Sequence, residues 1–292
     1  MTTEKITKQQ LELLSGFTCE RLSATPANRK LVRSFDNPRN PGLSETLKRA
    51  WNEDKSGKTA YYIVKDAAGD VLLFFSLKCG VLYNPNFLNI VKREYNKAKA
   101  LYNAVMNKPN VPKWAQEHVE KLRASGALHR GGLEEIVVHY FRMKGELDQL
   151  KKALKQEQQD EGSMKIVRTD RTYAGIELVH FCANERYRKK WKALNLGRPM
   201  GETLFWHFVV PTFLQINSFI GCEYVYLFAA DSTEDRTLIN YYENALQFTR
   251  PDDIGTTKPF YDFSCVFMCQ ELTMLKAYSS YFFQTFNRTD PV

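Results

Sequence analysis

Apolar runs along the chain predict a set of β-strands, and two of them form a hairpin. Residues 60–64 and 71–77 are rich in β-branched and aromatic side chains, and the short segment 66–70 between them contains Gly69. Two such runs joined by a few residues with a glycine are typical of a β-hairpin. Further strands are expected at residues 16–22, 174–182, 223–230 and 261–270.

Helical spacing of apolar residues occupies segments between these strands, at 43–51, 201–220 and 234–245. Pro211 lies inside the second segment, where its missing N–H and its ring are expected to kink the helix. Strands and helices in this order describe an α/β protein with a mixed sheet.

Residues 86–161 differ in character, because they are rich in Lys and Glu and carry two apolar stripes with helical spacing. Breaks at 107–112 and 125–132 imply two or three helices packed as a hairpin. We therefore expect an N-terminal part at 1–85, a helical insertion at 86–161 and a C-terminal part at 162–292. The insertion offers either a homodimer surface or a lid over an acceptor site.

The composition is that of a folded protein in water, with 43% hydrophobic and 25% charged residues among 292. No apolar run approaches the roughly 20 residues that a membrane-spanning helix needs. The first ten residues carry charges without the apolar centre of a signal peptide. We expect a cytoplasmic protein that does not enter membranes.

Metal and disulfide chemistry are not expected from the cysteines and histidines. The six cysteines are scattered, and they include no Cys-x-x-Cys pair. The five histidines form no spacing typical of a zinc site. The formal net charge of +8 favours an anionic partner, either nucleic acid or a phosphate-rich cofactor, although solubility alone also accounts for it.

Two stretches in the C-terminal part resemble the GNAT family of N-acetyltransferases. Residues 221–230 look like the family's strand that ends in a small acidic turn, and residues 238–248 look like its Phe-Tyr-Glu to Gly-Phe helix end. Tyr241 stands in place of the family's phenylalanine, and Gln247 in place of its glycine.

The N-terminal half, from Ser34 to Trp51 and through the hairpin ending at Gly80, is similar to acetyltransferase toxins that modify aminoacyl-tRNA. The resemblance implies a mixed, mostly antiparallel central sheet flanked by helices, interrupted here by a helical hairpin. It also implies transfer of an acetyl group from acetyl-CoA to a primary amine, which is a small molecule, a protein amine or an aminoacyl-tRNA.

The resemblance places the cofactor between the strands at 176–182 and 223–230, with its pyrophosphate on the following loop. The family's compact Arg/Gln-x-x-Gly-x-Gly/Ala loop is replaced by a long joint, 184–201, with glycines at 197 and 201. Backbone amides at a helix start hold phosphates, and glycine permits close approach. The expected cofactor contacts are Phe181, Cys182, Ala183, Arg186, Arg188, Lys189, Gly197, Arg198, Met200, Gly201, Glu202, Thr203 and Asp235.

The basic run has an alternative interpretation, and Asp235 departs from the family pattern. The cations of Arg186 to Lys192 either neutralise the cofactor's phosphates or form a solvated helical face. Asp235 stands where many family members have an asparagine that bonds the pantetheine arm.

Acyl transfer to an amine needs a neutral amine, a polarised carbonyl and a proton for the leaving thiolate. Tyr242 matches the family tyrosine that protonates the thiolate, with Tyr241 as the candidate one residue earlier; packing in the core is the alternative for both. Backbone amides near 181–183 correspond to those that polarise the thioester in the family.

Glu177 lies on the strand before the loop, where some family members place a carboxylate that removes the amine's proton. Burial would raise its pKa towards useful values. His180, three residues later, is expected to point to the opposite face and to be a core or edge residue.

Two other functions remain open from the sequence. One is a binding module on a GNAT scaffold that has lost catalysis, because a fold does not establish an activity. The other is a nucleic-acid binder in which the Lys-rich segments 92–99 and 144–155 lie along phosphates. Acidic residues interspersed in both segments also fit an ordinary solvated helix surface.

Overall fold

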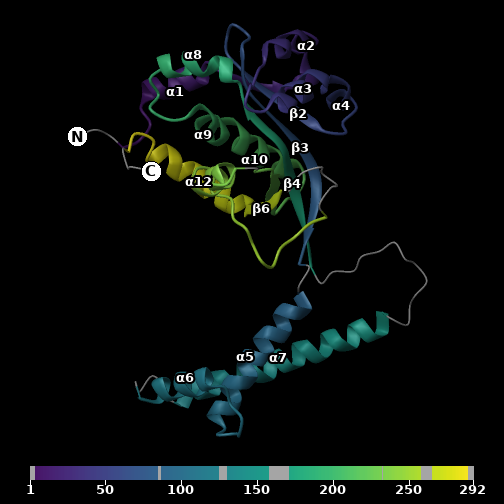
Figure 1. The fold of residues 1–292 in the computed structure, drawn as a ribbon, viewed down its shortest axis with the longest axis vertical. Helices are drawn as coiled ribbons and strands as arrows, with labels where there is room; N and C mark the ends of the chain where they lie inside the picture. The colour runs from purple at the N-terminus through teal and green to yellow at the C-terminus, as the bar shows by residue number, and fades with distance from the viewer. Residues whose placement is uncertain are drawn as a thin grey trace. The chain divides into compact units, whose positions relative to one another are not determined.

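The computed structural model describes residues 4–84, 87–124, 130–157, 171–231, 233–257 and 265–288. The chain divides into two compact units (Figure 1). One unit combines residues 1–82 with 172–292 and holds the sheet, and the other comprises residues 83–171 and is helical. The helical unit spans the expected insertion, 86–161, and extends past it at both ends.

A six-stranded sheet in the order β1-β2-β3-β4-β5-β6 forms the centre of the first unit. Its strands are β1 (Thr18–Arg21), β2 (Ala60–Lys65), β3 (Val71–Tyr83), β4 (Thr172–Ala183), β5 (Tyr224–Ala229) and β6 (Val266–Glu271). The pairs β1–β2, β2–β3 and β5–β6 are antiparallel, whereas β4 and β5 run parallel. The predicted α/β class with a mixed, mostly antiparallel sheet is therefore confirmed. Residues 261–264 of the last predicted strand lie outside the described residues.

The larger core lies between one face of this sheet and a layer of helices. These are α1 (Lys8–Ser15), α8 (Arg188–Ala193), α9 (Met200–Leu204), α10 (Val210–Phe219), α11 (Thr237–Asn244) and α12 (Leu272–Gln284). Phe205, Trp206 and Phe213 from the helices are fully or almost fully buried with Phe75 and Val225 from the sheet. We call this side of the sheet the helical face.

The opposite face carries a smaller core beneath short helices at the N-terminal end of the chain. They include α2 (Asn28–Leu31), α3 (Pro41–Arg49) and α4 (Trp51–Lys55), which lie close together in Figure 1. Phe35, Tyr61 and Phe74 are buried there. We call this side the second face.

Three features of the helices differ from the sequence predictions. Helix α1 was not expected, although Thr7 and Gln10 form a capping box at its start. The C-terminal aromatic segment forms helix α12, which was also not predicted. Near Pro211 the predicted irregularity is a π-helix, η4 (Phe205–Val209), and Pro211 lies in the first turn of α10, where its missing N–H costs least.

The helical unit contains α5 (Phe87–Val105), α6 (Lys113–Ala124) and α7 (Arg130–Glu157) among its described residues, which agrees with two or three predicted helices. Helix α5 packs on both of the others. Ala100 and Ala104 meet Ala115 and Val119 of α6. On its other side, residues including Val91 and Ala98 meet Met143 and Leu147 of α7.

Two glycines on the second face make room for Tyr226 of β5. A Cβ atom at Gly80 would lie 1.8 Å from the Tyr226 Oη, and one at Gly175 would lie 2.3 Å from the Leu82 Cδ1. Neither contact is possible without a shift of the surrounding atoms. Glycine at both positions therefore leaves room for the Tyr226 ring, and at Gly175 also for the Leu82 side chain.

Gly80→Ala is expected to destabilise the protein by about 1–3 kcal/mol, because the added methyl group overpacks the space beside the Tyr226 ring. Urea denaturation of the purified variant measures this loss. Gly221→Ala is the matched control, since a Cβ there meets no atom within 4 Å. Equal stability of the two variants would contradict the proposed packing role of Gly80.

Candidate active site

Strands β4 and β5 are paired over a short stretch and then separate. Their parallel register covers Gly175 to Glu177 of β4 and Tyr224 to Tyr226 of β5. β4 nevertheless continues to Ala183 and β5 to Ala229. Beyond Glu177, β4 therefore has no β5 partner, and the amides on that edge face the gap between the strands.

The side chains of β4 change faces within this unpaired stretch. Ile176 and Leu178 belong to the core of the helical face, as alternation requires, but Phe181 also belongs to it. Cys182 belongs to the core of the second face, and His180 stacks on Tyr61 of that core. In a regular strand, positions 178 and 181 point to opposite faces. The alternation is therefore broken between Leu178 and His180, as an extra residue in a β-bulge would break it.

This break corrects the prediction that His180 and Glu177 point to opposite faces. Glu177 points away from the helical face, because its neighbours Ile176 and Leu178 both point towards it. His180 contacts Tyr61 and Phe74 on the second face. Both side chains thus lie on the second face. The expectation failed because it assumed uninterrupted alternation from residue 177 to 180.

Tyr242 lies beside the gap on α11. Its side chain is buried in the core of the helical face. Burial raises the pKa of its phenol, and the Cys182 thiol adds to this effect. Because Cys182 is at the end of β4, the phenol lies near the unpaired part of that strand. At neutral pH the Tyr242 hydroxyl is protonated and able to donate a proton.

Tyr241 points in a different direction from Tyr242. Its hydroxyl lies by the start of α9, where a Cβ at Gly201 would come within 2.9 Å of it. Burial raises the pKa of this phenol as well. Tyr241 lines a cavity at the loop that follows β4, whereas Tyr242 is not among the residues lining that cavity.

Glu177 is a buried carboxyl group with 9% of its surface exposed. Burial raises its pKa above the usual range for glutamate, although the positive charge of Lys78 and a hydrogen bond with Tyr226 oppose this shift. A carboxylate in these surroundings is a stronger base than one in water. The Tyr226 that contacts it is the ring for which Gly80 and Gly175 leave room.

His180 lies on the same face of the sheet as Glu177 and contacts a buried serine. Its Nδ1 atom lies 2.7 Å from the Oγ of the fully buried Ser76. Burial lowers the pKa of the imidazole to about 4, so His180 is neutral at pH 7. The charge of Lys78 acts on both His180 and Glu177. The bond to Ser76 agrees with the core or edge histidine that the sequence indicated.

A cavity of about 700 Å³ opens where β4 passes into the long joint. Its lining residues are Ala183, Asn184, Glu185, Arg188, Trp191, Lys192, Asn195, Leu196, Gly197, Arg198, Pro199, Met200, Gly201 and Tyr241. No side chain caps the first turn of α9, so its first amides are available to an anion. Helix α9 continues through η4 and α10, so these amides begin a helical run from Met200 to Phe219. We call this cavity the loop cavity.

Six of the predicted cofactor residues line the loop cavity. They are Ala183, Arg188, Gly197, Arg198, Met200 and Gly201. Gly197 has a φ of +76°, a left-handed conformation that glycine adopts without strain. Several residues that were not predicted individually also line it, among them Asn184, Glu185 and Lys192. Lys192 belonged to the basic run noted in the sequence, so its charge was the available signal.

The predicted cations of residues 186–189 differ in their surroundings. Arg186 lies 3.3 Å from the Asp36 carboxylate and Arg188 lies 3.4 Å from that of Glu185. The side chain of Lys189 is exposed and is not among those lining the loop cavity. The basic run is thus divided between ion pairs, solvent and the cavity.

Arg198 also binds the C-terminal end of α12. Its Nε and Nη2 atoms donate to the carbonyl oxygens of Phe286 and Thr285 at 2.8 and 2.9 Å. These bonds hold the segment that follows α12 against the loop that contains Arg198. A structural role for Arg198 therefore accompanies its position in the cavity wall.

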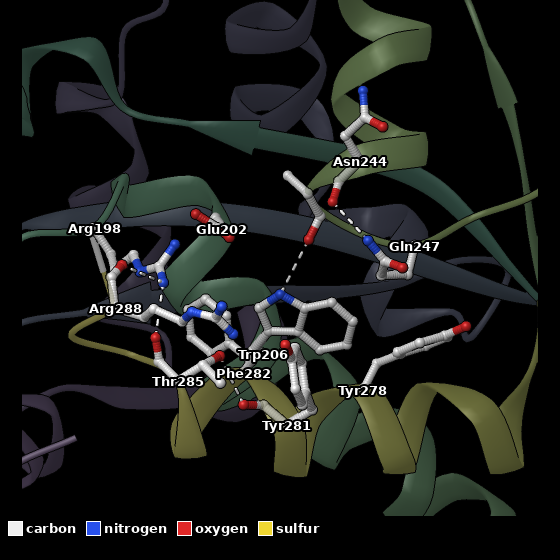
Figure 2. A pocket seen from close by; sticks show the side chains of 11 residues that line it. Arg198, Glu202, Trp206, Asn244, Gln247, Tyr278, Tyr281, Phe282, Thr285 and Arg288 are labelled. Atoms are coloured by element: carbon white, nitrogen blue, oxygen red, sulfur yellow. Dashed lines mark hydrogen bonds between the residues drawn. The ribbon is translucent and has the colours of Figure 1, made fainter. Parts of the chain in front are cut away.

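Glu202 lines a second cavity of about 270 Å³, which shares Arg198 with the loop cavity (Figure 2). Figure 2 places Glu202 and Arg198 at one end of this cavity and Tyr278 and Gln247 at the other, with Trp206 between them. Burial raises the pKa of Glu202, and the charge of Arg198 opposes this. The predicted cofactor contact Glu202 thus lines the second cavity and not the loop cavity.

Four further predicted contacts lie apart from the loop cavity. Thr203 is fully buried and its hydroxyl donates to the Pro199 carbonyl at 2.9 Å. Asp235 is exposed in the turn before α11, where its backbone carbonyl accepts from Asn240. Phe181 contacts the Phe205 ring edge to face, and Cys182 accepts a hydrogen bond from Asn37 at 3.1 Å. Phe181 and Cys182 lie on the part of β4 that borders the gap.

The described residues contain no group of three or more His, Cys, Asp or Glu that could hold a metal ion. Within the same ranges, every helix is too short or too polar to cross a membrane.

No family model matches this chain, and no curated protein sequence is similar to it. Solved structures with a partly similar fold include AtaTR bound with AcCoA, which is 11% identical and has a TM-score of 0.46 over 90% of this chain and 98% of that chain. A mutant of KacT is 10% identical, with a TM-score of 0.44 over 90% and 99%. AtaT complexed with acetyl-methionyl-tRNAfMet is 10% identical, with a TM-score of 0.42 over 90% and 98%. At these sequence identities and TM-scores, the comparisons do not indicate an activity for this chain.

Proposed function

We propose that this protein is an acetyl-CoA dependent N-acetyltransferase whose acceptor is a primary amine. The observation that carries the proposal is the parallel pair β4–β5, which is joined only from Gly175 to Glu177 and then parts beside Tyr242. A gap between two parallel strands gives a thioester access to backbone amides that have no strand partner. The resemblance in sequence at residues 221–230 and 238–248 supports the same function.

Acetyl-CoA supplies an activated thioester, and the residues around the gap suit its parts. The loop cavity fits the pyrophosphate, because uncapped amides at Met200 and Gly201 and the cations of Arg188 and Lys192 favour an anion. Amides on the β5 side of residues 181–183 are positioned to polarise the thioester carbonyl.

Proton transfers at the two ends of the reaction fall to different side chains. Glu177 takes a proton from the acceptor ammonium group, directly or through water, and the neutral amine attacks the carbonyl carbon. The bond from carbon to sulfur then breaks as the Tyr242 hydroxyl gives its proton to the leaving thiolate. The nitrogen loses its remaining extra proton as the amide forms, and this proton restores the Tyr242 hydroxyl. Burial raises the pKa of both groups, which keeps the Tyr242 hydroxyl protonated as a proton donor and makes the Glu177 carboxylate a stronger base.

The acceptor is identified by its amine alone. Small amines, protein amines and aminoacyl-tRNA all carry one, and the second face, where Glu177 lies, is where we place it. A catalytically inactive binding module and a tRNA-binding protein are the alternatives from the sequence. A cytoplasmic location and a homodimer through residues 86–161 are separate predictions that this chemistry does not need.

Acetyl-CoA is expected to raise the melting temperature of the purified protein, because a ligand that binds the folded state stabilises it by mass action. At about a 100-fold excess over Kd the stabilisation is about 2.7 kcal/mol. Lys192→Glu is expected to weaken binding by about three- to tenfold, since it places a negative charge in the loop cavity.

Lys189→Glu is the matched control, because it makes the same change in charge on a side chain that does not line the cavity. Transfer of labelled acetyl to a panel of amines and aminoacyl-tRNAs then distinguishes the enzyme from a binding module. A melting temperature that ignores saturating acetyl-CoA would contradict the proposed function. Stabilisation without transfer to any acceptor in the panel would favour the binding module.

A further inference from the structure

Helix α7 of the helical unit has an outer side that carries large apolar residues. Met143 and Leu147 face α5 and are buried. Val138 and Phe141 are 66% and 55% exposed. Residues three and four apart lie on one side of a helix, so Val138, Phe141 and Gly145 form a single stripe. We call this stripe the outer face of α7.

Gly145 gives this face a notch. A Cβ at Gly145 would meet no atom within 4 Å, so no neighbour among the described residues requires a glycine there. Glycine inside a helix is nevertheless about 0.5–1 kcal/mol less favourable than alanine. The missing side chain next to the exposed Phe141 leaves space for a residue from another helix to approach closely.

Charges on the outer face follow an order that suits a second copy of the same helix. Glu134 and Glu135 precede Val138, and Arg142 and Lys144 follow it. All four side chains are exposed. The two glutamates have no ion-pair partner among the described residues. The printed contacts of Arg142 stay within its own helix, since its Nε lies 3.8 Å from the Glu146 carboxylate and its Nη2 lies 3.5 Å from the His139 Nδ1.

Val138 lies four positions from both Glu134 and Arg142. In an antiparallel pair of α7 helices centred on Val138, Glu134 of each copy therefore meets Arg142 of the other. Two-fold symmetry creates the same attraction twice, at both ends of the contact. Val138 and Phe141 are covered in the middle of such a pair, and their exposed surface is removed from water.

We propose that the outer face of α7 binds a second copy of this chain as an antiparallel helix pair, so that the protein is a homodimer. The proposal does not depend on the acetyltransferase function. A second copy fits this face because an antiparallel copy places its Arg142 opposite Glu134. An unrelated partner would not require the two ends of this face to carry opposite charges.

Two charge-reversal variants test this arrangement. Glu134→Lys with Glu135→Lys makes the outer face entirely basic, and Arg142→Glu with Lys144→Glu makes it entirely acidic. Each variant alone is expected to be monomeric by light scattering after size exclusion, because like charges then meet in its own pair. A one-to-one mixture of the two is expected to form a heterodimer of twice the mass. Circular dichroism checks that both variants keep the helical content of the unchanged protein.

Val138→Asp with Phe141→Asp is an independent variant, expected to be monomeric even in the mixture with either charge variant. A monomeric unchanged protein across the concentrations that light scattering can reach would overturn the proposal. So would dimers that persist in both charge variants, or a mixture that stays monomeric. The last two results would mean that another surface makes the dimer or that the outer face binds a different partner.

Discussion

Replacement of Tyr242 by phenylalanine is expected to lower kcat for acetyl transfer by about 100- to 10,000-fold, the usual contribution of a positioned general acid. The ring stays in place in this variant, since the side chain is buried in the core of the helical face. Only the hydroxyl is lost, and with it the proton for the leaving thiolate. The binding of acetyl-CoA, measured by the rise in melting temperature, is expected to change little.

Tyr241→Phe is the matched control for this experiment. It removes the same group from the neighbouring ring, whose hydroxyl lies at Gly201 by the loop cavity. We expect this variant to alter the KM for acetyl-CoA more than kcat. If Tyr242→Phe kept its full kcat and Tyr241→Phe lost it, the assignment of the acid would be reversed. Full activity in both would leave Tyr242 as a packing residue.

Glu177→Gln is expected to lower kcat by a similar factor of about 100 to 10,000, because an amide cannot accept the proton of the acceptor amine. Burial raises the pKa of Glu177, so the unchanged enzyme should lose activity as the pH falls through that raised value. The acidic limb should be absent from the residual activity of the variant. Initial rates measured from acidic to neutral pH test both statements.

Lys78→Met is the companion variant, since the charge of Lys78 opposes the rise in the Glu177 pKa. Without that charge the pKa rises further, and the acidic limb should move to higher pH. A carboxyl whose pKa is raised by folding stabilises the native state below its unfolded pKa and loses this effect as the pH rises through the folded value. Glu177→Gln should therefore not lower the melting temperature at pH 7. A lower melting temperature with an unchanged pH profile would make Glu177 a structural residue.

The sequence predicted those parts of the fold that have a strong periodic signal. The hairpin at 60–64 and 71–77, the strand at 223–230 and the helices of the insertion all appear where the pattern placed them. Helix α12 was missed because its aromatic residues are spread around several sides. For α1, the charged segment concealed a capping box that Thr7 and Gln10 indicate in retrospect.

The candidate site was predictable in outline and not in its geometry. Tyr242 and Glu177 were singled out from a resemblance, and the structure places them on two sides of one sheet. The change of face after Leu178 has no marker in the sequence, because no glycine or proline interrupts residues 176–183. The side chain of His180 was therefore assigned to the wrong face. Similarly, the bonds from Arg198 to the end of α12 connect residues nearly ninety positions apart, which no local pattern reveals.

The helical unit is inserted between β3 and β4, which are neighbours in the sheet. The chain thus leaves the sheet from one strand and returns to it on the adjacent one, as it would through an ordinary hairpin turn. A connection between neighbouring strands can be short or long. The inserted segment can therefore change in length or in sequence while β3 and β4 stay neighbours, so the helical unit is free to change independently of the sheet.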